Sequence, residues 1–302
     1  MDYQNENNSN LKEKKCSHIA LIGSPNAGKS TLLNNLIGSK ISIISPKVQT
    51  TRNMINGICI YDNAQLIFID TPGIFTPSGK LEKAIVKVAW RGVSDAEQIA
   101  LLIDSKKGID KNTQNIIDAL VTKNLKACLI LNKIDLVKRT QLLLLAEELS
   151  KYENFTNIFM ISALTGEGVE DLKKHFRDNA DISEWLYPED EITTLPKRFF
   201  ATELVREQLF LNLDQELPYN LAVECEKWEE FDNGEVKINL VIYITRDSQK
   251  KIIIGKAGSM IKKIGQTARE ELEEMLEQKV HLFIFIKVRE NWLDNPDLLP
   301  TY

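Results

Sequence analysis

Eight residues near the amino terminus combine two glycines, a lysine and a hydroxyl in a spacing that suits phosphate chemistry. They read GSPNAGKS at positions 23–30, so that Gly23 and Gly28 frame four residues and Lys29 and Ser30 follow. The apolar run HIALI before them predicts a strand, and the pattern after them predicts a helix. Glycines let the main chain turn tightly, so that successive N–H groups and the helix N-terminus point at one anion. The stretch therefore predicts a site for the phosphates of a nucleoside triphosphate.

The side chains of this turn have separate predicted roles. Lys29 can reach the outer phosphates and is a predicted catalytic residue, and Ser30 can offer its oxygen to Mg²⁺. Asn26 could hold a K⁺ ion against the phosphates with its side-chain oxygen; the alternative is that Asn26 only forms the turn. The nucleotide contacts predicted in this turn are Gly23, Ser24, Pro25, Asn26, Ala27, Gly28, Lys29, Ser30 and Thr31.

A second stretch, LIFIDTPGI, ends an apolar run at Asp70. A carboxylate at that strand end can hold a water molecule of the Mg²⁺ ion opposite Ser30. Gly73 has no side chain, so its N–H can approach the γ-phosphate, and we predict that it acts in catalysis. The loop around it would rearrange when that phosphate leaves. The nucleotide contacts predicted in this stretch are Asp70, Thr71, Pro72, Gly73 and Ile74.

The polar stretch KVQTTRNM lies between the first predicted helix and the second predicted strand. Thr51 is the threonine predicted to close on Mg²⁺ and the γ-phosphate, as a metal ligand and a catalytic residue, and Thr50 is the alternative. One absence is informative. Ile74 follows DTPG where a Ras-like site has a glutamine, and an aliphatic side chain cannot orient the attacking water. We therefore expect slow intrinsic hydrolysis.

Two further stretches favour guanine as the base. In LILNKID, Asp135 can accept hydrogen bonds from adjacent N–H donors, which guanine displays and adenine does not, so a metabolic ATPase is disfavoured. Asn132 can hold the neighbouring loops, and in ISAL the N–H of Ala163 can reach guanine O6. All these stretches follow predicted strands, at the sheet edge where open α/β sheets bind ligands. The nucleotide contacts predicted in these two stretches are Asn132, Lys133, Asp135, Ser162 and Ala163.

The elements that must position these residues alternate along the first part of the chain. Short apolar runs and amphipathic segments from residue 18 to about 178 predict an α/β domain with a mostly parallel sheet and one antiparallel hairpin. A polar stretch with two prolines then predicts a linker, and the later elements, in the order α-β-β-α-α-β, predict a smaller α+β domain. The predicted boundaries are a disordered tail over 1–16, the nucleotide-binding domain over 17–184, the linker over 185–200 and the second domain over 201–302.

The second domain carries a glycine turn of its own, GKAG, within a basic segment of an otherwise acidic domain. A GxxG turn lets a nucleic-acid backbone come close, as in the KH arrangement, and apolar side chains beside it can support unpaired bases. The alternative is a KH-like domain that binds a protein partner. The predicted RNA-binding residues are Ile253, Ile254, Gly255, Lys256, Ala257, Gly258, Lys262 and Lys263.

Composition limits the classes of function. The net charge is −5, so nucleic acid must bind at a local patch rather than over the whole surface. Four scattered cysteines without a CxxC pair favour free thiols in a reducing cytoplasm. The sequence contains no apolar stretch long enough to span a bilayer.

Taken together, the stretches GSPNAGKST, QTTR, DTPGI, NKID, SAL, ATELVREQLF, ELPY and IIIGKAGSMIKKIG resemble the Era family of bacterial GTPases. The resemblance covers residues 17 to about 290. It implies a P-loop GTPase domain followed by a type II KH domain, with GTP or GDP, Mg²⁺ and K⁺ as ligands. Ile74 is similar to the residue of the related hydrophobic-substituted GTPases, and Asn26 matches the asparagine linked in such relatives to potassium activation.

The same resemblance implies GTP hydrolysis coupled to assembly of the small ribosomal subunit. The implied partner is the 3′ end of the small-subunit ribosomal RNA, bound as a single strand, with an additional peripheral contact with the inner membrane. We expect a monomer. The chain departs from the family in its longer amino-terminal tail and in its carboxyl end, NWLDNPDLLPTY, which is shorter than the usual last helix and contains a proline.

Overall fold

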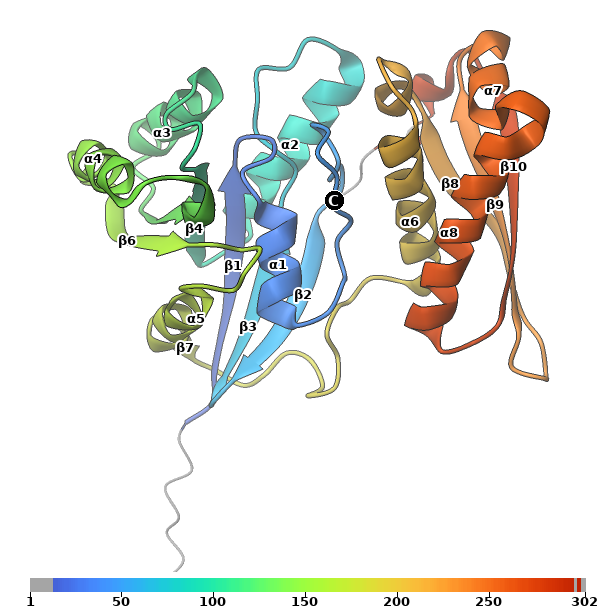
Figure 1. Ribbon diagram of the computed structural model, residues 1–302. Coiled ribbons are helices and arrows are strands. Elements are labelled where there is room, and N and C mark those ends of the chain that lie inside the picture. Colours follow the sequence, from blue (N-terminus) through green and yellow to red (C-terminus); the bar gives the residue numbers. More distant parts are fainter. Residues whose placement is uncertain (1–12, 296–297, 300–302) are drawn as a thin grey trace, which may run out of the picture.

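The computed structural model describes residues 13–295 and 298–299, which form two domains that lie side by side (Figure 1). The N-terminal domain is built on a seven-stranded sheet with the order β2-β3-β1-β4-β5-β6, and β7 pairs with β1. Its strands are β1 (Lys15–Gly23), β2 (Ile55–Tyr61), β3 (Ala64–Asp70), β4 (Gln98–Asp104), β5 (Ala127–Asn132), β6 (Phe155–Ile161) and β7 (Asp181–Ile182).

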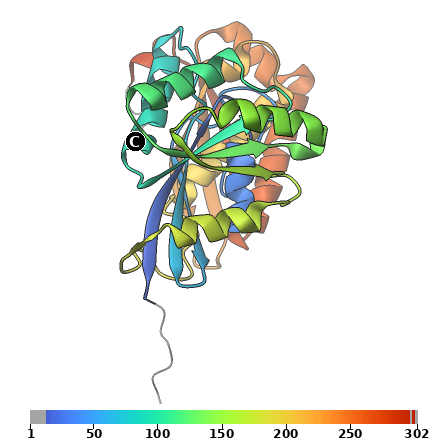
Figure 2. The same ribbon diagram turned by 90° about the vertical axis from the view of Figure 1, so that its left-hand side faces the viewer.

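Helices cover both faces of this sheet, as the nearly continuous apolar runs of its strands require. One core joins α1 and α5 to the sheet through residues such as Leu33 and Phe176, and the other joins α2, α3 and α4 through residues such as Val93, Ile117 and Leu145. Figure 2 shows the molecule with the N-terminal domain facing the viewer. The helices are α1 (Lys29–Ile37), α2 (Lys80–Ser94), α3 (Lys111–Thr122), η1 (Ile134–Leu136), α4 (Arg139–Leu149) and α5 (Val169–Asp178).

The strand pairing places the predicted site residues at one edge of the sheet. Strands β1, β3, β4, β5 and β6 run parallel, so their carboxyl ends, with Gly23, Asp70 and Asn132, lie together. The expected hairpin is present, since β2 and β3 are antiparallel and turn at Asp62 and Asn63. The predicted fold class of this domain is thus confirmed.

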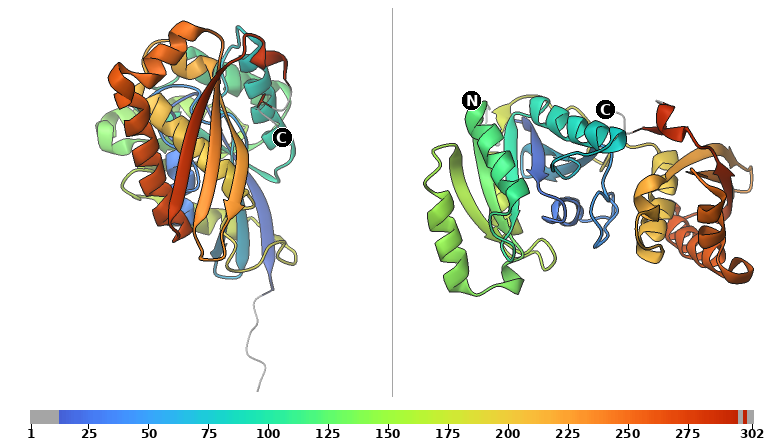
Figure 3. Two further views of the ribbon diagram at one scale, coloured as in Figure 1. Left: turned by 90° about the vertical axis from the view of Figure 1, so that its right-hand side faces the viewer. Right: turned by 90° about the horizontal axis from the view of Figure 1, so that it is seen from above.

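The C-terminal domain has the predicted order α-β-β-α-α-β and packs its helices on one face of a three-stranded sheet, ordered β10-β9-β8 (Figure 3). Strands β9 and β10 are parallel, and β8 and β9 are antiparallel. Its elements are α6 (Lys197–Asn212), η2 (Leu217–Asn220), β8 (Ala222–Glu230), β9 (Val236–Ile244), α7 (Asp247–Ile254), η3 (Lys256–Gly258), α8 (Ser259–Leu276), β10 (Val280–Val288) and η4 (Trp292–Asp294).

The segment between β7 and α6 is bonded to the first domain rather than loosely tethered. Gln65, fully buried on β3, accepts hydrogen bonds from the N–H groups of Leu186 (2.8 Å) and Tyr187 (3.1 Å) and donates one to the Tyr187 carbonyl (2.8 Å). Further along, the N–H of Ile58 on β2 donates to the carbonyl of Ile192 (2.9 Å). The predicted linker therefore follows the β2–β3 side of the sheet before α6 begins at Lys197.

We predict that Gln65→Met lowers the free energy of unfolding of the N-terminal domain by about 2–4 kcal/mol. Methionine has a similar volume but leaves two N–H groups and one carbonyl without their partner. Chemical denaturation followed by circular dichroism measures the change. Gln266→Met, at an exposed position of α8, is the control and should shift stability by less than about 0.5 kcal/mol. Equal stability of the two variants would contradict this account of the linker.

Candidate nucleotide-binding site and the second glycine turn

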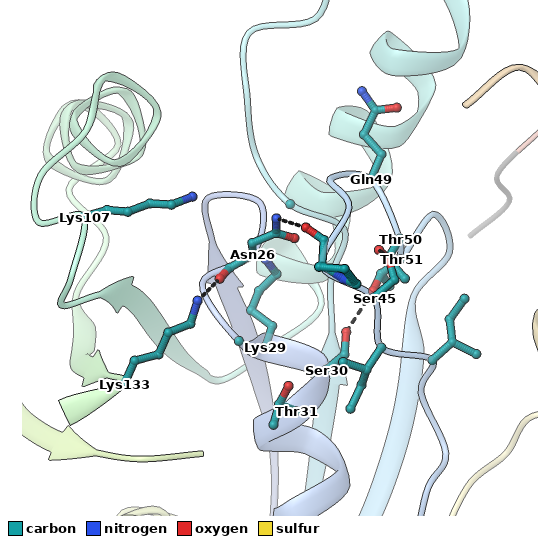
Figure 4. A pocket seen from close by; sticks show the side chains of 15 residues that line it. Asn26, Lys29, Ser30, Thr31, Ser45, Gln49, Thr50, Thr51, Lys107 and Lys133 are labelled. Carbon is teal, nitrogen blue, oxygen red and sulfur yellow. Dashed lines mark hydrogen bonds between the residues drawn. The ribbon is translucent and has the colours of Figure 1, made fainter. Parts of the chain in front are cut away.

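The predicted phosphate turn connects β1 to α1 and lines a cavity of about 460 Å³ (Figure 4). Gly28 is the N-cap of α1 in a left-handed conformation, with φ of 99°, and a Cβ atom there would meet the side-chain nitrogen of Asn132 at 2.2 Å. A glycine is therefore required at this position. The helix N-terminus faces the cavity with its free N–H groups, which is the arrangement that binds phosphate.

Lys29 lies buried at the base of this cavity. Its ammonium group donates to the carbonyls of Gly23 (3.2 Å) and Ser24 (3.1 Å), two groups of the turn itself. Burial lowers the pKa of Lys29 to about 8, against the opposing effect of the Asp70 charge. The lysine is thus a cation held without a full counter-charge, which a phosphate group would supply.

Asp70 and three hydroxyl groups form a cluster suited to a divalent cation. Ser30 donates to Asp70 Oδ2 (2.7 Å), Ser42 donates to the same oxygen (3.0 Å), and the Thr51 hydroxyl lies 2.9 Å from that of Ser30. Asp70 Oδ1 is buried and has no hydrogen-bond partner among the described residues. Burial raises the pKa of Asp70, and the charge of Lys29 opposes the shift. An orphaned carboxylate oxygen beside oxygen donors fits the ligand preference of Mg²⁺.

The geometry distinguishes the two threonines of the loop between α1 and β2. Thr51 points at Ser30, whereas the Thr50 hydroxyl bonds the Lys47 carbonyl (2.8 Å) and the Ser45 hydroxyl (2.7 Å) within its own loop. Of the two threonines, Thr51 is therefore the one whose hydroxyl lies in the Asp70 cluster. Ser42 was not predicted, because it belongs to no motif and reaches Asp70 only through the path of this loop.

Asn26 and Lys133 close the other side of the cavity. The side-chain nitrogen of Asn26 donates to the carbonyl of Pro46 (2.8 Å). Lys133 donates to the Asn26 carbonyl and to Asp104, both at 2.7 Å. Lys107 also lines the cavity and was not predicted; it follows β4 in a loop without a recognisable motif.

The residues predicted to recognise the base lie on neighbouring loops that one side chain joins. Asn132 is buried, donates to the Ala27 carbonyl (2.8 Å) and accepts from the N–H of Ala163 (2.9 Å). It thereby fixes the phosphate turn against the loop after β6. Asp135 lies on η1 and is exposed, free to accept hydrogen bonds from a base, while Ser162 is fully buried beneath Ala163.

The segment after β3 lies against the phosphate turn. A Cβ atom on Gly73 would meet Pro25 Cα at 2.9 Å, so only glycine allows this approach. Ile74 donates its N–H to the Gly23 carbonyl (3.0 Å) and its side chain is 5% exposed, packed in the core. It therefore cannot position a water molecule in the cavity.

The second glycine turn joins α7 to α8 in the C-terminal domain. Gly255 and Gly258 both have positive φ, 72° and 77°, and Lys256 between them is exposed. Beside the turn, Ile261, Lys262, Gly265, Arg269 and two residues of β10 line a groove of about 350 Å³, with Gln266 at its edge.

One predicted RNA-binding residue is wrong. Ile253 is fully buried in the core of the C-terminal domain, because helical periodicity turns this side of α7 inward. Its neighbour Ile252 is 56% exposed and was missed by the sequence analysis. The predicted Ile254 is partly exposed, and Lys256, Ala257, Lys262 and Lys263 are exposed.

Comparisons with known proteins agree with both halves of the structure. A family model described as a 50S ribosome-binding GTPase matches residues 18–133, and a KH domain model matches residues 216–293. The fold and these matches define a P-loop protein of the GTPase class that is followed by a KH domain.

The relatives extend over nearly the whole chain. GTPase Era of Sinorhizobium medicae is 53% identical over 92% of this chain and 90% of that protein, and GTPase Era of Rhizobium meliloti is 50% identical over 98% and 95%. The chain belongs to the Era family. A crystal structure of Era with MgGDPNP and nucleotides 1506–1542 of 16S ribosomal RNA is 37% identical, covers 94% of this chain and 97% of that chain, and superimposes with a TM-score of 0.89.

We predict that the affinity for GTP falls about fourfold between pH 7 and pH 8.5. With a pKa of about 8, Lys29 loses its proton over this range in the free protein and must take one up when a phosphate binds. Calorimetric titration in two buffers of different ionisation enthalpy measures both the affinity and the proton uptake. Lys29→Arg keeps its charge over this range, so the pH step should disappear. Binding without proton uptake at pH 8.5 would contradict the depressed pKa.

Proposed function

We propose that this chain is a GTP-hydrolysing switch that binds the 3′ end of the small-subunit ribosomal RNA and acts in assembly of the small ribosomal subunit. The observation that carries the proposal is the orphaned carboxylate of Asp70 among the hydroxyls of Ser30 and Thr51, next to a phosphate-binding turn. The solved Era relative, which was crystallised with a magnesium nucleotide and ribosomal RNA, supports it.

In this proposal Ser30 and Thr51 hold the metal directly and Asp70 holds it through water. The magnesium ion, when bound, neutralises charge on the β- and γ-phosphates. Lys29 contacts the same phosphates, and the Gly73 N–H contacts the γ-phosphate. Thr51 and Gly73 lie on two loops that lose these contacts when the γ-phosphate leaves, which is how hydrolysis changes the protein.

Guanine selection follows from Asp135, whose carboxylate accepts the two N–H donors of the guanine edge. The N–H of Ala163, predicted to reach the guanine oxygen, is instead bonded to the side-chain oxygen of Asn132 (2.9 Å). Because Ile74 is buried, its side chain cannot orient the attacking water, and we expect a slow intrinsic rate. We propose that the side-chain oxygen of Asn26 holds K⁺ beside the phosphates; its side-chain nitrogen donates to the Pro46 carbonyl.

Single-stranded RNA is clamped at the second glycine turn. The backbone approaches Gly255 and Gly258, where no Cβ obstructs it, and the exposed lysines beside the turn neutralise its phosphates. The groove lined by Ile261, Lys262 and Arg269 continues from the turn along α8 and offers apolar and basic contacts to the next bases.

Two finer predictions stand beside this function. We expect a monomer, and we expect any membrane contact to be peripheral and weak. Among the described helices, none combines the length and the apolar character that a bilayer crossing requires.

We predict that Gly258→Asp weakens RNA binding about tenfold more than Gly258→Asn. A Cβ at this position would have no atom within 4 Å, and both residues tolerate the left-handed conformation, so the two variants differ mainly in charge. Fluorescence anisotropy with an oligonucleotide of the 16S 3′ end measures the affinity, and nucleotide binding checks that both variants are folded.

If both variants bind this RNA as the parent does, the glycine turn is not an RNA clamp. The KH-like domain would then serve a protein partner.

A further inference from the structure

The loop between α1 and β2, residues 38–54, touches the nucleotide site and the C-terminal domain through adjacent residues. We name it the bridging loop. Thr51 faces Ser30 and the orphaned carboxylate of Asp70, and the next residue, Arg52, faces the other way and crosses to the second domain. The two residues are adjacent in sequence, so one short stretch of backbone makes both contacts.

Among the described residues, every hydrogen bond of the Arg52 guanidinium goes to a group of the C-terminal domain, and its Nε has no partner. It is 5% exposed, and its guanidinium donates to the carbonyls of Leu221 (2.7 Å), Tyr219 (3.0 Å) and Pro218 (3.1 Å) at η2. The ring of Phe210 lies beneath it, 5.8 Å from the guanidinium carbon to the ring centre. A fork of donors that meets three carbonyls defines one orientation of the arginine, which a lysine could not reproduce.

Loss of the three carbonyl partners would leave the Arg52 charge buried without hydrogen bonds and would destabilise the protein. Burial removes the Arg52 guanidinium from water, and arginine stays protonated in proteins. The guanidinium remains charged at neutral pH, so it depends on the three carbonyls for stabilisation. A buried cation that loses its partners is strongly destabilised. Arg52 therefore keeps this position only while the two domains are docked.

A second group of contacts holds the same loop from α6. Glu207, which is 4% exposed, accepts a hydrogen bond from the N–H of Ile44 (2.8 Å) and pairs with Lys40 (2.6 Å). Lys40 also pairs with Glu271 of α8 (2.6 Å), and Lys47 donates to the Leu213 carbonyl. The bridging loop is thus anchored on the C-terminal domain at both ends, with Thr51 next to one anchor.

We infer that Arg52 and Glu207 are positioning residues for Thr51, through which the docked C-terminal domain selects Mg²⁺-bound GTP over GDP. The inference rests on the proposed function of this site. Thr51 contacts the metal and the γ-phosphate only in the triphosphate state, so holding it in place strengthens GTP binding and leaves GDP binding almost unchanged. By linkage, GTP strengthens docking of the domains by the same factor.

The test compares the affinities of a non-hydrolysable GTP analogue and of GDP in full-length Arg52→Ala, Arg52→Lys and Glu207→Ala. In Mg²⁺ buffer we expect each variant to bind the GTP analogue at least fivefold more weakly and GDP within twofold of the parent. Glu207→Gln keeps an oxygen for the Ile44 N–H and should recover part of the loss. Without Mg²⁺ the difference between variants and parent should vanish, because Thr51 acts through the metal.

Asp294→Ala is the matched control. It removes an exposed ion pair between the domains, Lys80–Asp294, which does not involve the bridging loop, and should leave both affinities unchanged. Thermal unfolding checks each variant, and Glu207→Gln tests the inference even if Arg52→Ala does not fold.

Two outcomes would overturn the inference. Equal losses of affinity for the GTP analogue and for GDP would indicate a purely structural role. An affinity ratio of GTP analogue to GDP that is unchanged in all variants would show that the contacts do not act on Thr51. If the parent itself bound neither nucleotide, the proposed function would fail instead.

Discussion

The structure depends on a fully buried carboxylate, that of Asp70, at the carboxyl end of β3. Two hydroxyls satisfy one of its oxygens and the other is orphaned, while the nearest cation, Lys29, is itself buried. Burial raises the pKa of the acid and lowers that of the lysine, so it disfavours the charged form of each group. A metal ion beside the carboxylate and a phosphate beside the lysine relieve both groups together, which accounts for a nucleotide and a metal that bind as one unit.

The nucleotide and metal site is linked to the C-terminal domain through two adjacent residues of the bridging loop. Thr51 closes the metal cluster, and Arg52 carries the same stretch of backbone into the C-terminal domain. At the other end of the loop, Lys40 pairs with Glu271 on α8, the helix that begins at the second glycine turn and also carries Lys262 and Lys263. Docking thereby pairs an acid of this helix and leaves Lys256 of the glycine turn exposed.

The sequence predicted the parts of this system that local spacing encodes. The phosphate turn, Asp70, Gly73 and Asn132 are recognisable because their chemistry needs a particular residue directly after a strand, and the apolar periodicity placed those strands. The sequence could not predict two site residues, Ser42 and Lys107. It also could not predict that Arg52 makes a contact between the domains. Arg52 meets its partners more than 160 positions further along the chain, and only the packing of the two domains brings them together. Ile253 was misplaced for a related reason, since three successive isoleucines on a short helix do not show which one faces the core.

The central claim is that the nucleotide governs RNA binding through the bridging loop, and the affinity of the full chain for the 16S 3′-end oligonucleotide in two nucleotide states tests it most directly. The bridging loop joins the nucleotide site to the domain that carries the second glycine turn, so a change at Thr51 should alter how that domain binds RNA. The affinity for the RNA should therefore differ at least fivefold between protein loaded with Mg²⁺ and a non-hydrolysable GTP analogue and protein loaded with GDP, in line with couplings of about 1–3 kcal/mol. Equal affinity in the two states, with both nucleotides shown to be bound, would contradict the account.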